Sequence, residues 1–344
     1  MKSTSRWASV AAVCVLLSGQ GCTESPTAPQ PADPPASFAK VKSFTMTELL
    51  PPTAWGAAFS YAAAVNDNGK VVGIYAGPPG WESKGWSWQK GEFTDLGTFW
   101  PRDINDKGQM VGYSRSAGHV LWDNGVTTPL PGPAVAINKW GHVVGTLTGD
   151  RYHAYLWRDG TTTDLGSLHP GSPNFWLDYS EAVGVNDNDQ VVAQTGMGAW
   201  YDPYRALLWE NGTWTELGTA APGNDGMSRP TGISDNGQVV GLATSAIYHD
   251  LPFLWQDGVM TTIGSNPGFH DAEAIDDKGV VAGGCNELAG SAQRNFPCLY
   301  YDGGLTELES VASSYATVRD MSPGGKFIVG TSQAYPAHPV VWAR

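Results

Sequence analysis

The chain has 344 residues, a length that fits two average domains or one large all-β domain. Asp and Glu (33) outnumber Lys and Arg (20), and the formal charge of −13 argues against binding to a nucleic-acid backbone. Hydrophobic residues make up 41% of the chain and charged residues 15%, which excludes a disordered protein, while 43 glycines and 24 prolines favour many turns.

The first 21 residues have the features of a signal peptide. Lys2 and Arg6 form a basic start, and the apolar run at 8–17 is too short to span a bilayer. The stretch that ends at Cys22 resembles a bacterial lipoprotein signal, in which the cysteine after the cleavage site is lipidated. We therefore expect export, with Cys22 as a lipid anchor in the cell envelope. An ordinary signal peptide, which leaves an extracellular protein with a free thiol, is the alternative.

Residues 22–42 form a proline-rich segment with few large apolar side chains. Such a segment stays extended, at about 3.1 Å per residue. We expect a tether that holds the folded part away from a membrane, and the alternative is a disordered terminus without that role. Two cysteines remain beyond it, Cys285 and Cys298. An isolated pair in an exported chain is best interpreted as a disulfide.

The decisive feature of the sequence is an internal repeat. Its first part has the pattern Ile/Val-Asn-Asp-Xaa-Gly-Xaa-Val-Val-Gly and recurs about every 43 residues. The seven copies are Val65–Gly73, Ile104–Gly112, Ile137–Gly145, Val185–Ala193, Ile233–Gly241, Ile275–Gly283 and Met321–Gly330.

The second part of the repeat is an aliphatic–aromatic pair, a turn and then Thr-Asp/Glu-Leu. Most of these turns are Asn-Gly or Asp-Gly, the strongest short signals for a type I′ hairpin. Each repeat is therefore predicted to be two hairpins, which together make a four-stranded antiparallel unit. The aromatic residues are Trp88, Trp122, Trp157, Trp209, Trp255, Tyr300 and Trp342.

Seven such units predict an all-β fold, a seven-bladed β-propeller over residues 43–344. The last repeat ends after its third strand, at 339–342, and the missing fourth strand is found at 44–50. The N-terminal strand is thus expected to complete the last blade and close the ring, which buries the edges that an open array exposes.

The repeat resembles the extracellular HAF family, which is named for a His-Ala-Phe run before Leu-Trp. The closest echoes are HAYLW at His153–Trp157 and TTTDLG at Thr161–Gly166. The resemblance implies export and a propeller-like repeat fold, and it implies no particular activity. Asp189 in place of the turn glycine and Tyr300 in place of the tryptophan depart from the pattern in single blades.

The repeated residues are better explained by structure than by ligand binding. An aromatic at one strand position of every repeat is expected to pack between neighbouring blades. The Asn-Asp-Xaa-Gly turns lack the ligand spacing of an EF-hand, and Asn and Asp suit tight turns for conformational reasons. The seven histidines are spread over several repeats. We therefore expect no metal and no cofactor.

Function is expected where the repeat is least regular. The connections between second and third strands, and those between blades, share one face and carry all the variation in length. The two longest flank the fourth repeat and bring together aromatic, acidic and basic groups suited to sugars. The candidate ligand-binding residues are Phe175, Trp176, Asp178, Tyr179, Glu181, Trp200, Tyr201, Asp202, Tyr204 and Arg205. Packing of the aromatics at the channel mouth is the alternative.

The sequence contains no nucleophile elbow, zinc-protease motif, phosphate loop or dinucleotide fingerprint. The favoured interpretation is a monomeric, non-catalytic protein, without a nucleic-acid partner, that binds a glycan, an envelope polymer or a surface protein. A polysaccharide hydrolase or lyase on the same face is one alternative. Its candidate acids are Asp103 and Asp320, which share a position where other repeats have Ala or Gly. A purely structural envelope protein is the other.

Overall fold

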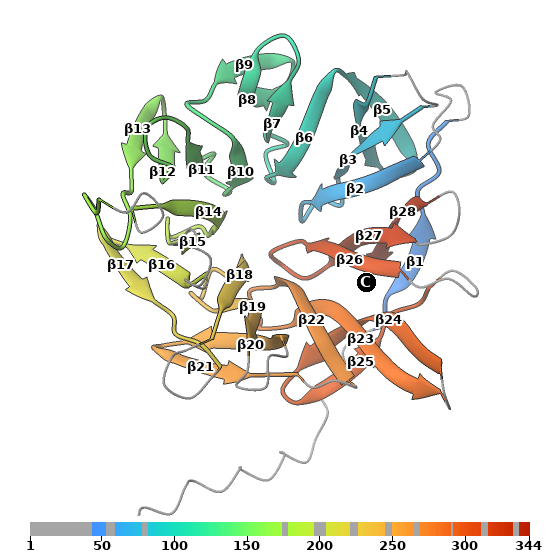
Figure 1. Ribbon diagram of the computed structural model, residues 1–344. Helices are drawn as coiled ribbons and strands as arrows, with labels where there is room; N and C mark the ends of the chain where they lie inside the picture. The colour runs from blue at the N-terminus through green and yellow to red at the C-terminus, as the bar shows by residue number, and fades with distance from the viewer. Residues whose placement is uncertain are drawn as a thin grey trace, which may run out of the picture. The chain divides into compact units, whose positions relative to one another are not determined.

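A computed structural model describes residues 43–52, 59–77, 82–173, 178–195, 204–220, 226–244, 250–264, 268–289, 292–310, 316–332 and 337–344. All regular structure in these ranges is β-strand, and the strands form seven antiparallel sheets of four. Figure 1 shows the sheets as blades around a centre, with the first strand of each blade innermost. The predicted seven-bladed propeller is confirmed. No helix in the described ranges is long and apolar enough to cross a bilayer.

The first three blades follow the chain without interruption. Blade 1 contains β2 (Phe59–Val65), β3 (Val71–Ala76), β4 (Lys84–Gln89) and β5 (Glu92–Gly97). Blade 2 contains β6 (Phe99–Ile104), β7 (Met110–Ser114), β8 (Gly118–Asp123) and β9 (Val126–Pro129). Blade 3 contains β10 (Ala134–Ile137), β11 (Val143–Leu147), β12 (His153–Arg158) and β13 (Thr161–Asp164).

The next three blades repeat this order. Blade 4 contains β14 (Ser180–Val185), β15 (Val191–Thr195), β16 (Ala206–Glu210) and β17 (Thr213–Glu216). Blade 5 contains β18 (Ser228–Ile233), β19 (Val239–Thr244), β20 (Asp250–Gln256) and β21 (Val259–Thr262). Blade 6 contains β22 (Gly268–Ile275), β23 (Val281–Ala289), β24 (Ala292–Tyr301) and β25 (Gly304–Glu307).

Blade 7 is built from both ends of the propeller. Its strands β26 (Ala316–Met321), β27 (Phe327–Ser332) and β28 (His338–Ala343) are joined by β1 (Thr45–Glu48) as the outer strand. The register runs from Thr45 opposite Ala343 to Glu48 opposite Val340. The N-terminal strand therefore closes the ring as predicted, and no blade is left with an unpaired fourth position.

The hairpin turns confirm the turn chemistry expected from the sequence. Lys90, Asn124, Asp159, Asn211, Asp257 and Asp302 have φ between 46° and 51°, and the glycine after each is also positive, as a type I′ turn requires. Asp189, which replaces a turn glycine, adopts the left-handed conformation itself, with φ 59°. Asp tolerates this region better than most residues do, so blade 4 forms normally.

The hydrophobic core lies between the blades. Buried apolar side chains gather into seven groups, one at each seam, and each group contains one of the seven repeated aromatics. Trp342, for example, is fully buried between blades 6 and 7. The predicted packing role of these aromatics is confirmed. The Cys285–Cys298 disulfide is also present, on the long hairpin of blade 6.

The first strand of every blade shifts its register by one residue at the same place. In each first strand, the shift comes directly after the residue that pairs with the last position of the repeat. That last position is glycine in six blades and Ala193 in blade 4. A Cβ on Gly241 would lie 2.0 Å from the carbonyl oxygen of Arg229, so the close approach of the two strands there requires glycine. The extra residue of this β-bulge lies on the channel wall.

Candidate functional site

The channel has two unlike ends. At the turn mouth lie the tight turns between the first and second strands of each blade, and at the loop mouth lie the connections of variable length. A cavity of about 580 Å³ occupies the turn half and is lined by all seven first strands. The bulged residues on its wall are Ala63, Arg102, Val135, Val183, Thr231, Glu273 and Arg319.

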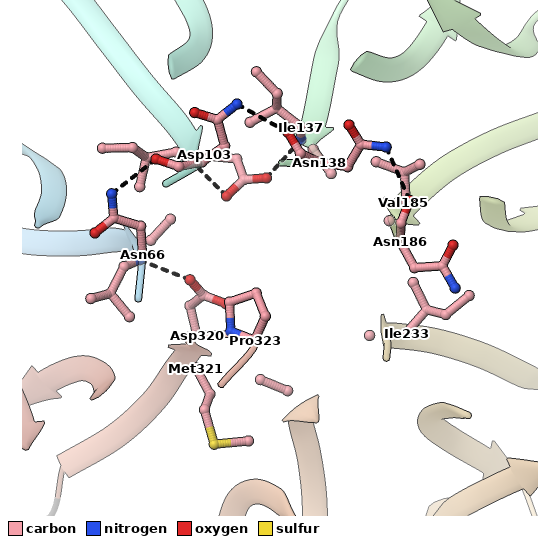
Figure 2. A pocket seen from close by; sticks show the side chains of 18 of the residues that line it. Asn66, Asp103, Ile137, Asn138, Val185, Asn186, Ile233, Asp320, Met321 and Pro323 are labelled. Atoms are coloured by element: carbon pink, nitrogen blue, oxygen red, sulfur yellow. Dashed lines mark hydrogen bonds between the residues drawn. The ribbon is translucent and has the colours of Figure 1, made fainter. Parts of the chain in front are cut away.

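At the turn mouth the repeated Asn-Asp pairs join each blade to the next. The side-chain amides of Asn66, Asn105, Asn138 and Asn186 donate to a main-chain oxygen of the following blade, at 2.9 to 3.1 Å. Figure 2 shows Asn66, Asn138 and Asn186 around the channel. The same Asn oxygens accept peptide N–H groups inside their own turns, as in Asn138 with Trp140 and His142. These residues therefore do more than suit a tight turn.

The second residue of the turn adds a ring of carboxylates. Asp106, Asp187, Asp235, Asp277 and Asp67 each accept the peptide N–H of the preceding blade at 2.8 or 2.9 Å. Burial, and then repulsion from Asp277 and Asp187, raises the pKa of Asp235 to about 6. The pKa values of Asp106 and Asp277 are raised as well, mainly by burial. Every carboxylate of this ring is already used to hold a seam.

Asp103 and Asp320, the candidate acids, lie on the channel wall at matching positions of β6 and β26. Asp103 accepts the peptide N–H of Ile137 in the next blade at 2.8 Å, and Asp320 accepts that of Val65 at 2.9 Å (Figure 2). Burial raises the pKa of Asp103 to about 7, with a contribution from the charge of Asp320. Burial likewise raises the pKa of Asp320 to about 6.

The middle of the channel carries two arginines. Arg102 and Arg319 line both the cavity at the turn mouth and a second one at the loop mouth, so they lie where the two meet. They come from blades 2 and 7, with Ala63 of blade 1 between them in the ring. Neither guanidinium makes a hydrogen bond or ion pair with the described residues. Glu273 is close enough to Arg319 to be affected by its charge, but burial and Asp271 raise the pKa of Glu273 to about 7.

The loop mouth opens into a groove of about 530 Å³ over blades 7, 1, 2 and 3. Its floor is aromatic. Trp100 stacks on Tyr113 with ring centroids 5.4 Å apart and planes at 29°, and His119 meets Tyr113 edge-on at 5.2 Å. Tyr61 and Tyr113 are 42% and 37% exposed, so their rings are open to solvent. We call Tyr61, Trp100, Tyr113 and His119 the aromatic platform.

The surroundings of the aromatic platform hold Trp100 in place and keep His119 uncharged. The indole N–H of Trp100 donates to the main-chain oxygen of Ser83 at 2.7 Å, which holds the ring against blade 1. Burial lowers the pKa of His119, so the imidazole is neutral at neutral pH. Sequence reasoning missed this platform because Trp100 and Tyr113 belong to the regular strands β6 and β7, and only their cross-strand pairing brings them together.

The residues predicted around blade 4 have different environments. Asp178 is buried and bonded to Ser167, His153 and Gly171, and these bonds lower its pKa against the effect of burial. Arg205 forms an ion pair with Glu216 at 3.0 Å and bonds to Gly226. Both support the fold around blade 4.

Glu181 and Tyr179 lie at the loop mouth, on the opposite side of the ring from blade 1. Glu181 accepts hydrogen bonds from Tyr179 and Gln194 and shares its strand position with Trp100. Tyr204 contributes to the raised pKa of Tyr179, about 12, which is due mainly to burial. The other candidates, Phe175, Trp176, Trp200, Tyr201 and Asp202, and the proposed anchor Cys22, lie outside the described residues.

No group of three or more His, Cys, Asp and Glu side chains in the described ranges has the arrangement of a metal site. His142 and His153, the best placed histidines, pair with carboxylates. His142 bonds to Asp189 at 2.7 Å, and His153 bridges Asp164 and Asp178.

Several solved structures share this architecture. The β-propeller domain of the Trilobed protease from Pyrococcus furiosus has a TM-score of 0.56 and 9% identity, over 83% of this chain and 94% of that one. That domain has an open velcro topology, whereas here β1 pairs with β28.

Two peptidases are also similar. The acylaminoacyl peptidase of Pyrococcus horikoshii has a TM-score of 0.54 at 12% identity, covering 83% of this chain and 51% of that one. A puromycin-hydrolyzing peptidase of Mycobacterium tuberculosis has a TM-score of 0.53 at 12% identity, covering 86% and 54%. The chain spans about half the length of these two peptidases, and at such identities the likeness shows the fold alone. The sequence matches no protein-family model and no curated protein.

Proposed function

We propose that the protein is a non-catalytic binding propeller that holds a glycan on the aromatic platform at its loop mouth. The observation that carries this proposal is the exposed stack of Trp100 on Tyr113, with His119 and Tyr61 beside it. Aromatic rings with one open face offer a flat apolar surface, and sugar rings present C–H groups to such surfaces. A concave aromatic site with a few polar groups is the usual form of a small-ligand pocket.

The rest of the loop mouth extends this site. Glu181 and Tyr179 lie at the loop mouth, across the ring from the aromatic platform. We propose that they contact a longer polymer whose first unit lies on the aromatic platform. An envelope polymer or a surface glycoprotein fits this arrangement better than a small metabolite does.

Binding is favoured over cleavage because the candidate carboxyl groups already accept hydrogen bonds within the protein. Asp103 and Asp320 each accept a peptide N–H of the next blade, which uses them in the ring. Every binding assay should still measure released sugar, because product would revive the hydrolase or lyase alternative.

We also propose that the propeller is exported and anchored. This proposal is supported by the signal-like residues 1–21, by Cys22 and by the proline-rich segment 22–42, which suits a tether. The repeat pattern supports membership of the HAF family, and we propose a monomer. Mass spectrometry of the mature N-terminus tests the anchor, because a Cys22→Ser variant should lose both the lipid mass and membrane association.

The test of binding uses the full-length protein on an array of bacterial and plant polysaccharides. Trp100→Ala should weaken every hit by about tenfold or more, because it removes the larger ring of the stack. Trp140→Ala is the matched control, since Trp140 is 54% exposed but lies at the turn mouth. A blank array with folded protein, or equal loss in both variants, would contradict the proposal.

A further inference from the structure

The two arginines in the middle of the channel have no role in the fold that the described residues reveal. Other arginines of the described residues form ion pairs, as Arg205 does with Glu216 and Arg158 with Asp189. Arg102 and Arg319 are exposed, and within the described ranges neither has an ion-pair or hydrogen-bond partner. In a chain with a formal charge of −13, two unpaired guanidinium groups that line the same groove need a reason.

Their position relative to the aromatic platform is fixed by strand geometry. Trp100 and Arg102 are two residues apart on β6, and Arg102 is the extra residue of the β-bulge. Arg319 approaches from β26, and the small side chain of Ala63 leaves space between the two arginines. Both arginines and Trp100 line the same groove. A ligand that fills this groove can therefore touch the aromatic platform and the arginines at once.

We infer that the ligand is anionic, a sugar unit bearing a carboxylate, with its acid group bound by Arg102 and Arg319 and its ring against Trp100 and Tyr113. Guanidinium groups match the planar geometry of a carboxylate and bind it by paired hydrogen bonds. This inference rests on the proposed function and specifies the ligand of the same site.

The carboxyl groups nearest to the arginines are buried acids with raised pKa values. Burial is the main influence on the pKa values of these acids and raises them. The charge of Arg102 opposes it at Asp103, and the charge of Arg319 opposes it at Asp320 and Glu273. Burial raises the pKa of Asp103 and of Glu273 to about 7 and that of Asp320 to about 6, so at pH 7 Asp103 and Glu273 are about half ionised and Asp320 is mostly ionised.

The experiment compares polymers that differ only in charge. Polygalacturonate and alginate are offered to the full-length protein as salts and as their methyl esters, which keep the sugar ring and remove the carboxylate charge. The salts should bind about tenfold more tightly than the esters or better, as expected for a charge-assisted hydrogen bond. Added salt should reduce the difference, because it screens the attraction.

Three variants assign the effect to residues. The double variant Arg102→Gln with Arg319→Gln should lose the preference for the salts, and Trp100→Ala should weaken salts and esters alike. Arg229→Gln is the matched control, since Arg229 lies on the same face outside the groove and faces Asp250 at 3.9 Å. It should leave the preference unchanged.

The outcomes separate this inference from the proposed function. Equal binding of salts and esters, with Trp100 still required, overturns the inference and leaves the glycan site. Binding of dextran sulfate as tight as that of the carboxylated polymers overturns the assignment to carboxylates. An unchanged preference in the double arginine variant also overturns the inference. Failure of the folded protein to bind any polymer on the array overturns both proposals.

Discussion

The two mouths of the channel use their polar side chains in opposite ways. At the turn mouth the repeated Asn and Asp side chains bond to the next blade, so their hydrogen-bonding groups are used within the protein. At the loop mouth the residues do not repeat, and Arg102 and Arg319 have no partner among the described residues. The comparison teaches that the repeated polar residues of this propeller hold the ring, while Arg102, Arg319 and the aromatic platform, which occur in single blades, are available to a ligand.

The largest expected effect comes from a repeated aromatic. Trp342→Ala should lower the free energy of unfolding by about 3 to 5 kcal/mol, because the indole is fully buried and its N–H donates to the main-chain oxygen of Glu309. Chemical denaturation monitored by circular dichroism measures the loss. Trp100→Ala, in the same assay, should cost much less. If the two variants lost equal stability, the division between the mouths would be wrong.

A repeated polar residue at the turn mouth should have the next largest effect. Asn138→Ala removes two donated bonds to blade 4, to Asn186 and Asp189, and leaves the peptide N–H groups of Trp140 and His142 without their acceptor. We expect a loss of about 1 to 3 kcal/mol in the free energy of unfolding. Thr161→Ala, on the exposed outer strand β13, is the control and should change it by no more than about 0.5 kcal/mol. Sugar binding should be the same in both variants.

Much of the turn mouth was readable from the sequence. The repeat, the Asn-Gly and Asp-Gly turns and the missing last strand together predicted the blades, their number and the closure by β1. They did so because turn type and strand alternation are local properties of the chain. The bonds from each Asn to the next blade were not predicted, since their partners lie 33 to 48 residues away, as with Asn105 and Asn138.

The loop mouth was less readable, for a physical reason. A β-bulge shifts the side-chain alternation by one residue, so the pattern alone does not say that Arg102 and Arg319 line the channel. The aromatic platform depends on Trp100 lying opposite Tyr113 across two strands. The sequence predicted function on the face of the loop mouth and drew attention to blade 4, where Glu181 lies at this mouth.

The buried acids of the channel predict a pH dependence of stability. The folded-state pKa of Asp103 is raised to about 7, so between its unfolded value of 3.8 and this value the folded protein binds the extra proton. The stabilisation is complete at low pH and is lost as the pH rises through 7, by at most about 1.4 kcal/mol per pH unit. Denaturation curves from pH 4 to pH 8 should show this decline.

Asp103→Asn keeps an acceptor for Ile137 and removes the titration, so it should make the decline shallower. Glu273 and Asp320, with pKa values of about 7 and 6, should preserve part of the slope. A slope as steep as that of the unaltered protein would show that Asp103 ionises as easily in the folded chain as in the unfolded one.

The smallest net effect on the free energy of unfolding is expected at the seam between blades 3 and 4, where the repeat varies. In three seams a glutamine contacts the turn glycine of the next blade, as Gln190 does with Gly237, whereas between blades 3 and 4 the pair is His142 and Asp189. Replacing only Asp189 by Gly removes the partner of His142 and of Arg158, while replacing only His142 by Gln leaves Asp189 with its left-handed backbone.

The double variant, His142→Gln with Asp189→Gly, introduces the pair that three other seams use. Its free energy of unfolding should lie within about 1 kcal/mol of the unaltered protein, with a coupling between the two changes of about 0.5 to 3 kcal/mol. Denaturation of the two single variants and the double variant gives that coupling directly. A coupling near zero would mean that the two residues act independently. In that case the turn mouth would hold its blades together through each turn alone, and the contrast with the loop mouth would rest on the Asn bonds and the packed aromatics.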